Sequence, residues 1–185
     1  MSQPYQNSRY LGTLLTGLTT PVRRRIFISY HHDNDQSYYN ELSRVLHDKM
    51  DLVFDNSLDR LIDSDNTDYV IQRIRDKFIA GTSCTIVLCG PETHQRKYVD
   101  WEIKATLEKG HGLIGIALPT ISRNLQGQSI VPDRLASNYH SGYAVWKSWD
   151  DLAANPALMA TWIEDAVARD QSKIVNPQAI KARNG

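Results

Sequence analysis

The stretch that decides the fold spans residues 84–112 and reads CTIVLCGPETHQRKYVDWEIKATLEKGHG. Its first residues are almost all apolar, which predicts a strand over residues 83–89 that is buried on both faces of a sheet. A Gly-Pro pair then breaks the strand. Apolar residues return at helical spacing until Gly110, a residue typical of a helix end. The predicted helix carries Trp101 and Glu102 side by side, so an aromatic ring and a carboxylate follow a buried strand.

Strand-like and helix-like segments alternate along the rest of the chain. Regular alternation of this kind predicts an α/β protein whose parallel sheet is covered by helices on both faces. We therefore expect a three-layer, flavodoxin-like fold with a five-stranded parallel sheet. The other strands are predicted at residues 25–30, 51–54, 113–118 and 143–149, and the other helices at residues 38–49, 68–78 and 156–169.

The predicted α/β domain spans residues 25–170. Residues 1–24 are polar and interrupted by Gly and Pro, which indicates a flexible N-terminal arm and not a secretory signal. Residues 171–185 are expected to form a frayed C-terminal tail. Residues 120–142 form a long connection rich in Ser, Gly and Asn, and a connection of this length is usually functional or mobile.

Charge balance and cysteine placement limit the classes of partner and compartment. The chain has 185 residues with 21 Lys and Arg and 21 Asp and Glu, so we expect no attraction to nucleic acid. No segment reaches the roughly 20 apolar residues of a membrane span. Cys84 and Cys89 lie in one predicted strand, about 16 Å apart on opposite faces, and therefore cannot form a disulfide. Two unpaired thiols are typical of a reducing cytosol, so we expect a cytoplasmic protein.

Four polar segments are predicted to meet at one edge of the sheet. In open parallel sheets, ligands bind outside the carboxyl ends of the strands. The segments that follow those ends are residues 29–35, 55–68, 90–102 and 119–142. We therefore expect a binding site at this edge, which we call the carboxyl-end rim.

Three short motifs resemble those of a known family in their order and spacing. RIFISY, at residues 25–30, is similar to the opening strand of a TIR domain. VLCGPETHQRKYVDWEI, at residues 87–103, is similar to the G-x-x-T…R-x-x-V-x-W-E-I pattern of bacterial TIR-like proteins, and LIGIALP, at residues 113–119, completes the series. Over about residues 24–168 the chain thus resembles the TIR proteins of the Thoeris anti-phage system, although the motifs leave the N-terminal arm unexplained.

The resemblance implies an enzyme of anti-phage defence that has NAD as its substrate and needs no further cofactor. TIR enzymes of this kind cleave the bond between nicotinamide and ribose. The Thoeris proteins use the reaction to form an ADP-ribose-derived signal, linear or cyclic, which activates a separate effector after a phage-derived trigger. Assembly into a homo-oligomer is implied for many signalling members. In this family a glutamate on the helix after the third strand lies beside the ribose, and Glu102 is the matching position.

Glu102 has both a chemical and a structural interpretation. Cleavage of NAD passes through an oxocarbenium-like ribose, and one carboxylate beside the sugar stabilises the developing positive charge. The nicotinamide nitrogen is already cationic, so its departure requires neither a strong acid nor a metal. Spacing alone favours an exposed helix glutamate paired with Lys97 or Lys104, whereas the resemblance favours catalysis.

Seven further residues are candidate substrate contacts, each with a structural alternative. Those at the end of the first strand precede a helix N-terminus, where N–H groups receive phosphates, or they are ordinary loop residues. The aromatic rings near Glu102 form a wall for the nicotinamide or adenine ring, or they pack in the core. The hydroxyl of Thr93 caps the third helix or contacts the ligand. The acidic second loop lacks the glycine and closing glutamate of an EF-hand, so a helix cap explains it better than a bound cation. The seven candidates are Tyr30, His31, Asp33, Asp55, Thr93, Tyr98 and Trp101.

Other function classes are weighed against the enzyme. The patterns GxGxxG, GxxxxGK[ST] and GxSxG are absent from the sequence, which disfavours a dehydrogenase, a P-loop NTPase and an elbow-type hydrolase. The main alternative is a non-enzymatic TIR interaction module that acts by self-association. A phosphorylated receiver domain would use Asp33 and Asp35, but the third strand ends without the Asp that such a domain phosphorylates.

Overall fold

The structure is a computed structural model that describes residues 23–47, 51–53 and 66–184. Its centre is a parallel sheet with the strand order β2-β1-β3-β4-β5, which is the order of flavodoxin-like sheets. The predicted α/β class with a parallel sheet is confirmed. Four strands have four to six residues each, whereas β2 adds only three residues at one edge. The strands are β1 (Arg25–Ser29), β2 (Asp51–Val53), β3 (Cys84–Cys89), β4 (Gly112–Ala117) and β5 (Val145–Ser148).

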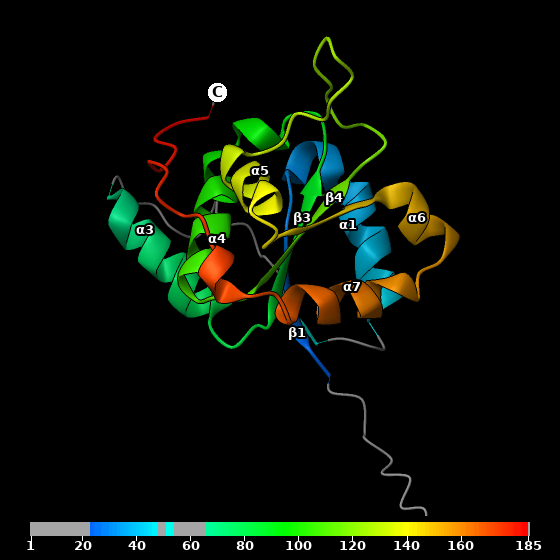
Figure 1. Ribbon diagram of the computed structural model, residues 1–185, viewed down its shortest axis with the longest axis horizontal. Helices are drawn as coiled ribbons and strands as arrows, with labels where there is room; N and C mark the ends of the chain where they lie inside the picture. The colour runs from blue at the N-terminus through cyan, green and yellow to red at the C-terminus, as the bar shows by residue number, and fades with distance from the viewer. Residues whose placement is uncertain (1–22, 48–50, 54–65, 185) are drawn as a thin grey trace, which may run out of the picture.

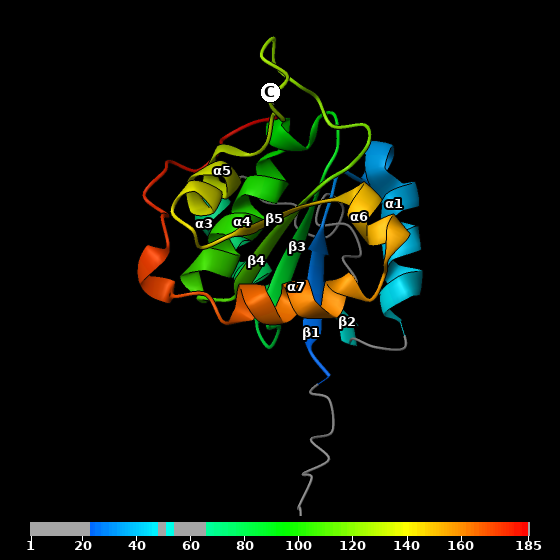
Figure 2. The same ribbon diagram turned by 45° about the vertical axis from the view of Figure 1, so that its right-hand side comes forward.

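Helices cover both faces of the sheet and so produce three layers (Figure 1 and Figure 2). One outer layer contains α1 (His32–Leu46), α6 (Trp149–Ala154) and α7 (Leu158–Val167). The other contains α3 (Thr67–Ile74), α4 (Lys97–Glu108) and α5 (Asp133–His140), and a π-helical turn, Arg75–Ile79, continues α3.

Alternating side chains in the strands separate two cores. Ile26 and Ile28 of β1 pack against α1, α6 and α7, whereas Phe27 lies on the opposite face beneath α3 and α4. Cys84 and Cys89 also lie in opposite cores, and both are buried and free, so the prediction that they do not pair is confirmed. Burial raises the pKa of both thiols and keeps them protonated.

The first helix begins earlier than its apolar spacing predicted. α1 starts at His32, whereas the sequence predicted a start at residue 38 and a polar loop before it. The first two turns are polar, yet Asp35 within them is fully buried. Tertiary contacts of a polar side chain, which apolar periodicity does not detect, therefore determine where this helix begins.

The connection predicted at residues 120–142 contains the short helix α5. Three of its eight side chains are buried, and two of these, Arg134 and Asn138, are polar. A pattern that counts only apolar residues therefore misses the helix. Sequence patterning also missed α6, which Pro156 separates from α7.

The C-terminal segment is packed against the domain, and the prediction of a frayed tail at residues 171–185 is wrong for residues 171–184. We call residues 174–184 the C-terminal strap. Figure 1 shows the strap in red, beyond the last helical turn, and it contacts α4 and α5. Ile174 and Ile180 pack against the two cores on that side of the sheet.

The predicted N-terminal arm mostly precedes the described residues. Residues 1–22 lie outside them, and Arg24 forms a hydrogen-bonded ion pair with Glu164 of α7 at 2.8 Å. Within the ranges that the structure describes, no helix is both long enough and apolar enough to cross a membrane.

Candidate functional site

The carboxyl ends of β1 and β3 meet in the middle of the sheet. The two strands are paired in register, with Ser29 opposite Val87. The chain passes from β1 to β2 on one side and then returns to β3 on the other. This is therefore the topological switch point, where open α/β sheets bind ligands. The N-terminus of α1 and the loop of residues 90–96 follow these strand ends and form the central part of the carboxyl-end rim.

Asp35 of α1 connects the two loops of the rim. Its side chain is fully buried, and its Oδ2 accepts a hydrogen bond from the Thr93 hydroxyl at 3.2 Å. The same hydroxyl accepts a hydrogen bond from the Gly90 N–H at 2.8 Å. A Cβ at residue 90 would overlap the Asp35 carboxylate, so only glycine permits this approach of α1 to the end of β3.

Burial also changes the protonation of Asp35. Loss of hydration raises the pKa of this carboxyl to about 6, and the nearby charge of Glu92 adds to the rise. Hydrogen bonds from Thr93 and from the backbone of His31 act in the opposite direction. Among the described residues, Oδ1 of Asp35 has no hydrogen-bond partner. The rim thus contains a carboxyl group that titrates where an ordinary aspartate is fully ionised.

Glu102 lies on the face of α4 that points to the sheet. One turn later on that face, the hydroxyls of Thr106 and Thr85 of β3 are 2.7 Å apart and hydrogen-bonded. Because α4 runs back from the carboxyl end of β3, residue 102 lies about 6 Å closer to the rim than residue 106. This level corresponds to the end of β1, where Ser29 is also buried.

The alternative of an exposed helix glutamate at residue 102 is wrong, because Glu102 is only 3% exposed. The lysines considered as its partners have contacts elsewhere. Lys104 Nζ binds Glu108 Oε1 at 2.6 Å, and Lys97 Nζ lies 5.3 Å from the centroid of the Trp101 ring. A carboxylate held inside the domain at this level is suited to charge stabilisation, because the low local dielectric strengthens its field.

The candidate contacts at the end of β1 differ in their placement. Tyr30 is nearly buried, its ring stacks on Tyr39 at a centroid distance of 4.3 Å, and its hydroxyl donates to Gln36 Oε1 at 3.0 Å. His31 is also nearly buried and occupies the N-cap position of α1. The Asp33 side chain is 93% exposed and lies on the outer surface. The structure therefore buries Tyr30 and His31 in the rim, whereas the side chain of Asp33 points from the rim into solvent.

The candidates near α4 also differ from one another. Thr93 was expected to cap α4, but the N-cap is Arg96, and the Thr93 hydroxyl instead binds within the rim. Trp101 is 3% exposed and donates its indole N–H to the carbonyl of Lys181 at 2.9 Å. Its ring therefore lies in the core beneath the C-terminal strap. Tyr98 is partly buried and meets Trp101 edge to face, with centroids 5.0 Å apart.

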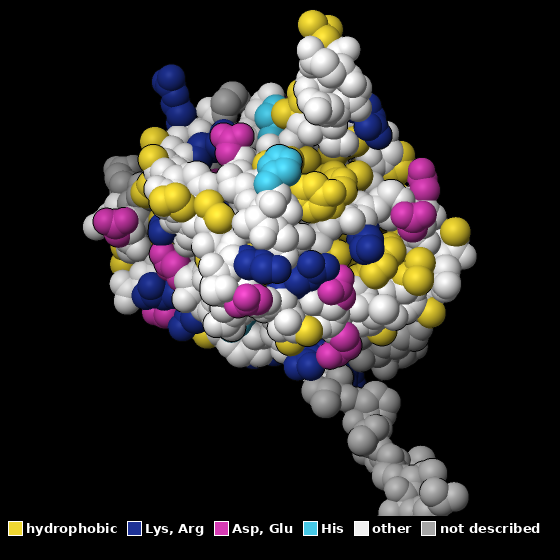
Figure 3. All heavy atoms as spheres, in the orientation of Figure 1, with side chains coloured by type: hydrophobic (Ala, Val, Ile, Leu, Met, Phe, Trp, Pro, Cys, Tyr) yellow, Lys and Arg dark blue, Asp and Glu magenta, His cyan; other side chains and the backbone are white. Residues whose placement is uncertain are grey.

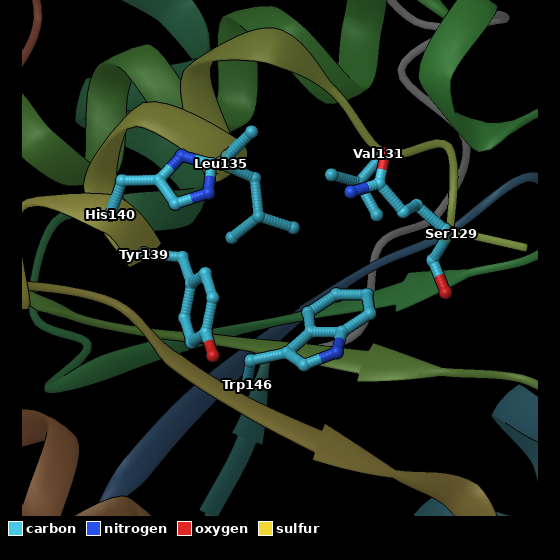
Figure 4. Close-up of a pocket in the computed structure, with 8 residues that line it drawn as sticks. Ser129, Val131, Leu135, Tyr139, His140 and Trp146 are labelled. Atoms are coloured by element: carbon cyan, nitrogen blue, oxygen red, sulfur yellow. The ribbon is translucent and has the colours of Figure 1, made fainter. Parts of the chain in front are cut away.

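A separate pocket of about 310 Å³ lies between α5 and the edge strand β5 (Figure 4). Trp146 forms one side, and it lies against β4 because Gly115 has no side chain there. Tyr139 lies beside Trp146, and His140 lies farther from it, next to Leu135 (Figure 4). Figure 3 shows hydrophobic side chains gathered beside a histidine on this face of the molecule. None of the candidate site residues lines the pocket, so it is distinct from the carboxyl-end rim.

Asp55 and the rest of residues 54–65 lie outside the described residues. Across the residues that are described, no three His, Cys, Asp or Glu side chains form a group that could hold a metal ion.

Two polar residues that lie in the predicted rim segments were not singled out from the sequence. Asp35 was considered with Asp33, as the acidic pair of a receiver domain, and Arg134 lay in the connection predicted at residues 120–142. Gly90, directly after β3, was a sequence signal for the contact with Asp35, since a glycine at the end of a strand often marks a position that another part of the chain approaches closely. No comparable signal existed for Arg134.

Comparison with known proteins gives two matches. The sequence model of the family described as "Thoeris protein ThsB, TIR-like domain" matches residues 27–123, which is just over half of the chain. A protein of Bacillus cereus (strain MSX-D12), named "Putative cyclic ADP-D-ribose synthase ThsB1", is 32% identical over 101 residues. The alignment covers 51% of this chain and 52% of the relative, so the chain matches about half of the relative's length.

Proposed function

Since the chain belongs to the family of Thoeris ThsB TIR-like domains, we propose that it is an NAD-consuming enzyme of anti-phage defence. The proposed reaction cleaves the bond between nicotinamide and ribose and forms an ADP-ribose-derived nucleotide. The name of the Bacillus cereus relative, "Putative cyclic ADP-D-ribose synthase ThsB1", supports this substrate and product class. The proposal includes a phage-derived trigger, and a separate effector that binds the nucleotide product.

The reaction requires one bond to break and one to form at C1′ of the ribose. The electron pair of the C1′–N bond leaves with nicotinamide, whose ring becomes neutral. Positive charge develops on C1′ and the ring oxygen as the bond lengthens. Water then attacks C1′ and releases a proton to give ADP-ribose, or a nitrogen of the adenine attacks to give a cyclic product.

The burial of Glu102 at the level of the strand ends is the observation that carries the proposal. With 3% of its surface exposed, the side chain is held by the packing of α4 on the sheet. A carboxylate in such a position accepts hydrogen bonds from the ribose hydroxyls and stabilises the positively charged sugar. Its effect is largest in the transition state, because the charge on the sugar is largest there.

The remaining rim residues are proposed to bind and orient the substrate. Tyr30 and His31 lie beside the N-terminus of α1, whose N–H groups are suited to a phosphate of the dinucleotide. Tyr98 offers a partly buried ring close to the N-terminus of α4. Thr93 is proposed to act through the shape of the loop, because its hydroxyl already binds Gly90 and Asp35.

The product is tested in cells that carry the trigger. Nucleotides are extracted from phage-exposed cells that express the chain or its Glu102→Gln variant, and they are analysed by mass spectrometry. The chain is expected to deplete NAD and to accumulate an ADP-ribose-derived nucleotide, and Glu102→Gln is expected to abolish both changes. Equal NAD levels and no new nucleotide with either protein, together with protection by both, would instead support a non-enzymatic module that acts by self-association.

A further inference from the structure

We propose that Arg134 and the C-terminal strap position the first turns of α4, and thereby the carboxylate of Glu102. The expected effect of this arrangement on NAD turnover rests on the proposed function, but its expected effect on the position of α4 does not. Arg134 is a positioning residue in this account, because it contacts α4 and the strap and is not one of the residues proposed to touch the substrate.

Arg134 is the buried centre of this arrangement. Its side chain is 0% exposed, and its guanidinium meets both carboxylate oxygens of Asp100, at 2.9 Å from Nε and 3.4 Å from Nη2. Asp100 lies in the first turn of α4, two residues before Glu102. A planar guanidinium bound to two oxygens fixes the orientation of its partner, which a single point contact does not.

The strap uses the remaining donors of Arg134. Nη2 donates to the carbonyls of Gln178 at 3.1 Å and Ala179 at 3.3 Å, and Nη1 donates to the side chain of Asn176. Arg134 thus joins three elements that are far apart in the sequence: α5, the first turn of α4 and the strap. Because the charge is fully buried, loss of these partners would leave unsatisfied donors and is strongly disfavoured.

The strap also binds α4 directly at three positions of its first turns. The backbone N–H of Lys181 donates to Asp100 Oδ2 at 3.0 Å, and the Lys181 carbonyl accepts from the Trp101 indole at 2.9 Å. The N–H of Lys97 donates to Asn184 Oδ1 at 2.9 Å. The N-cap residue Arg96 makes no side-chain cap hydrogen bond, so Asn184 supplies that bond from 87 residues away.

These contacts restrict how α4 can rotate or fray. Bonds at residues 97, 100 and 101, which are spaced i, i+3 and i+4, hold one face of the helix against the strap just before Glu102. A rotation of one residue about the helix axis would turn a side chain by about 100° and move the carboxylate out of its buried position. The strap therefore converts an N-terminus without a local cap into a fixed support for residue 102.

The test measures hydrogen exchange of α4 in full-length variants. Arg134→Lys keeps the charge but cannot form the forked set of bonds, and Asn184→Ala removes only the exposed cap. Gln171→Ala is the control, because Gln171 Nε2 binds the carbonyl of Gly110 at the opposite end of α4. Exchange is followed in peptides that cover residues 97–104 and, for comparison, β3. Turnover of NAD is recorded for the same proteins.

Arg134→Lys is expected to speed exchange in residues 97–104 by tenfold or more, and Asn184→Ala by about fivefold, the factor of a typical helix cap. Protection of β3 is expected to stay unchanged in both, and Gln171→Ala is expected to leave residues 97–101 as they are. In an active enzyme kcat is expected to fall more than KM rises, because NAD contacts are retained while Glu102 is displaced.

Unchanged exchange at residues 97–104 in both variants would overturn the inference. So would an equal loss of protection in β3, since Arg134 would then support the whole domain and not α4 in particular. If the triggered wild-type chain does not turn over NAD, the proposed function fails, yet the exchange result still decides whether the strap positions α4.

Discussion

The carboxylate of Asp35 lies so close to the Cα of Gly90 that any Cβ at residue 90 would overlap it. The two residues come from α1 and from the end of β3, and Thr93 binds both through one hydroxyl. This contact fixes the distance between the two loops that form the central part of the rim. It also explains why the chain has a glycine directly after a strand that is buried on both faces.

Gly90→Ala is expected to lower the free energy of unfolding by about 1–3 kcal/mol, because the added methyl group forces Asp35 out of its buried position. The measurement is urea unfolding in a double-mutant cycle with Asp35→Ala. In the Asp35→Ala background the alanine at residue 90 meets no carboxylate, so its cost is expected to be smaller. An equal cost in both backgrounds would show that the contact does not restrict residue 90.

Asp35 is expected to make stability depend on pH. Its pKa rises to about 6 in the folded state from an ordinary value near 3.8, so the folded protein binds this proton more tightly than the unfolded chain. The resulting stabilisation is complete below about pH 4 and is lost as the pH rises to about 6. Asp35→Asn is therefore expected to match the wild type at pH 4 and to be more stable by about 3 kcal/mol at pH 7.5.

The difference between Asp35→Asn and the wild type is measured by urea unfolding at several pH values. Taking the difference removes the contribution of the other carboxylates. Asparagine keeps an oxygen that accepts the Thr93 hydrogen bond, so the variant tests the charge and not the contact. A stability difference that is the same at pH 4 and pH 7.5 would contradict the assignment.

Two ion pairs with nearly equal distances are expected to differ widely in their importance. Arg134 and Asp100 lie 2.9 Å apart in the interior, whereas Arg169 and Asp165 lie 2.8 Å apart on the surface of the last helical turns. Asp100→Asn is expected to cost about 3–5 kcal/mol, because it leaves a buried guanidinium without its counter-charge. Asp165→Asn is expected to cost less than about 1 kcal/mol, because water screens the exposed pair.

Thermal or urea unfolding of the two Asp→Asn variants provides the comparison. The surface pair controls for the general effect of removing a carboxylate from a helix. Similar losses for both variants would mean that burial of the Arg134 pair adds nothing, which would also remove a support for the role of the C-terminal strap.

The apolar pattern was sufficient to predict the sheet but not all of the helices that pack against it. The buried strands β3 and β4 appear where residues 84–89 and 112–117 are apolar, and Gly110 follows the end of α4 as expected, with the His111 N–H bound to the Thr106 carbonyl. Burial of apolar surface determines these elements, and periodicity measures that burial.

The elements that were missed depend on polar burial. Arg134 and Asn138 hold α5, and Asp35 holds the start of α1, through hydrogen bonds to residues 34 to 58 positions away along the chain. Local patterning contains no information about such partners. The C-terminal strap was predicted to fray for the same reason, because its partners on α4 are about 80 residues earlier.

The residues of the candidate site also differ in how far the sequence predicted their positions. Spacing alone assigned Glu102 to the surface, and only the family resemblance favoured a role in chemistry. The structure places its side chain in the interior because α4 lies against β3 at Thr106 and Thr85. Trp101, by contrast, lies in the core beneath the strap, which is the position that the alternative of a packing role described.

Release of nicotinamide from NAD by the purified, triggered protein tests the central claim most directly. Glu102→Gln is compared with Glu108→Gln, an exposed glutamate of the same helix, so that a general effect on α4 is controlled. We expect Glu102→Gln to lower kcat by at least about 100-fold, the usual effect of removing one transition-state contact, with an unchanged melting temperature. Glu108→Gln is expected to retain nearly full activity. Equal rates for Glu102→Gln and the wild type would contradict the account.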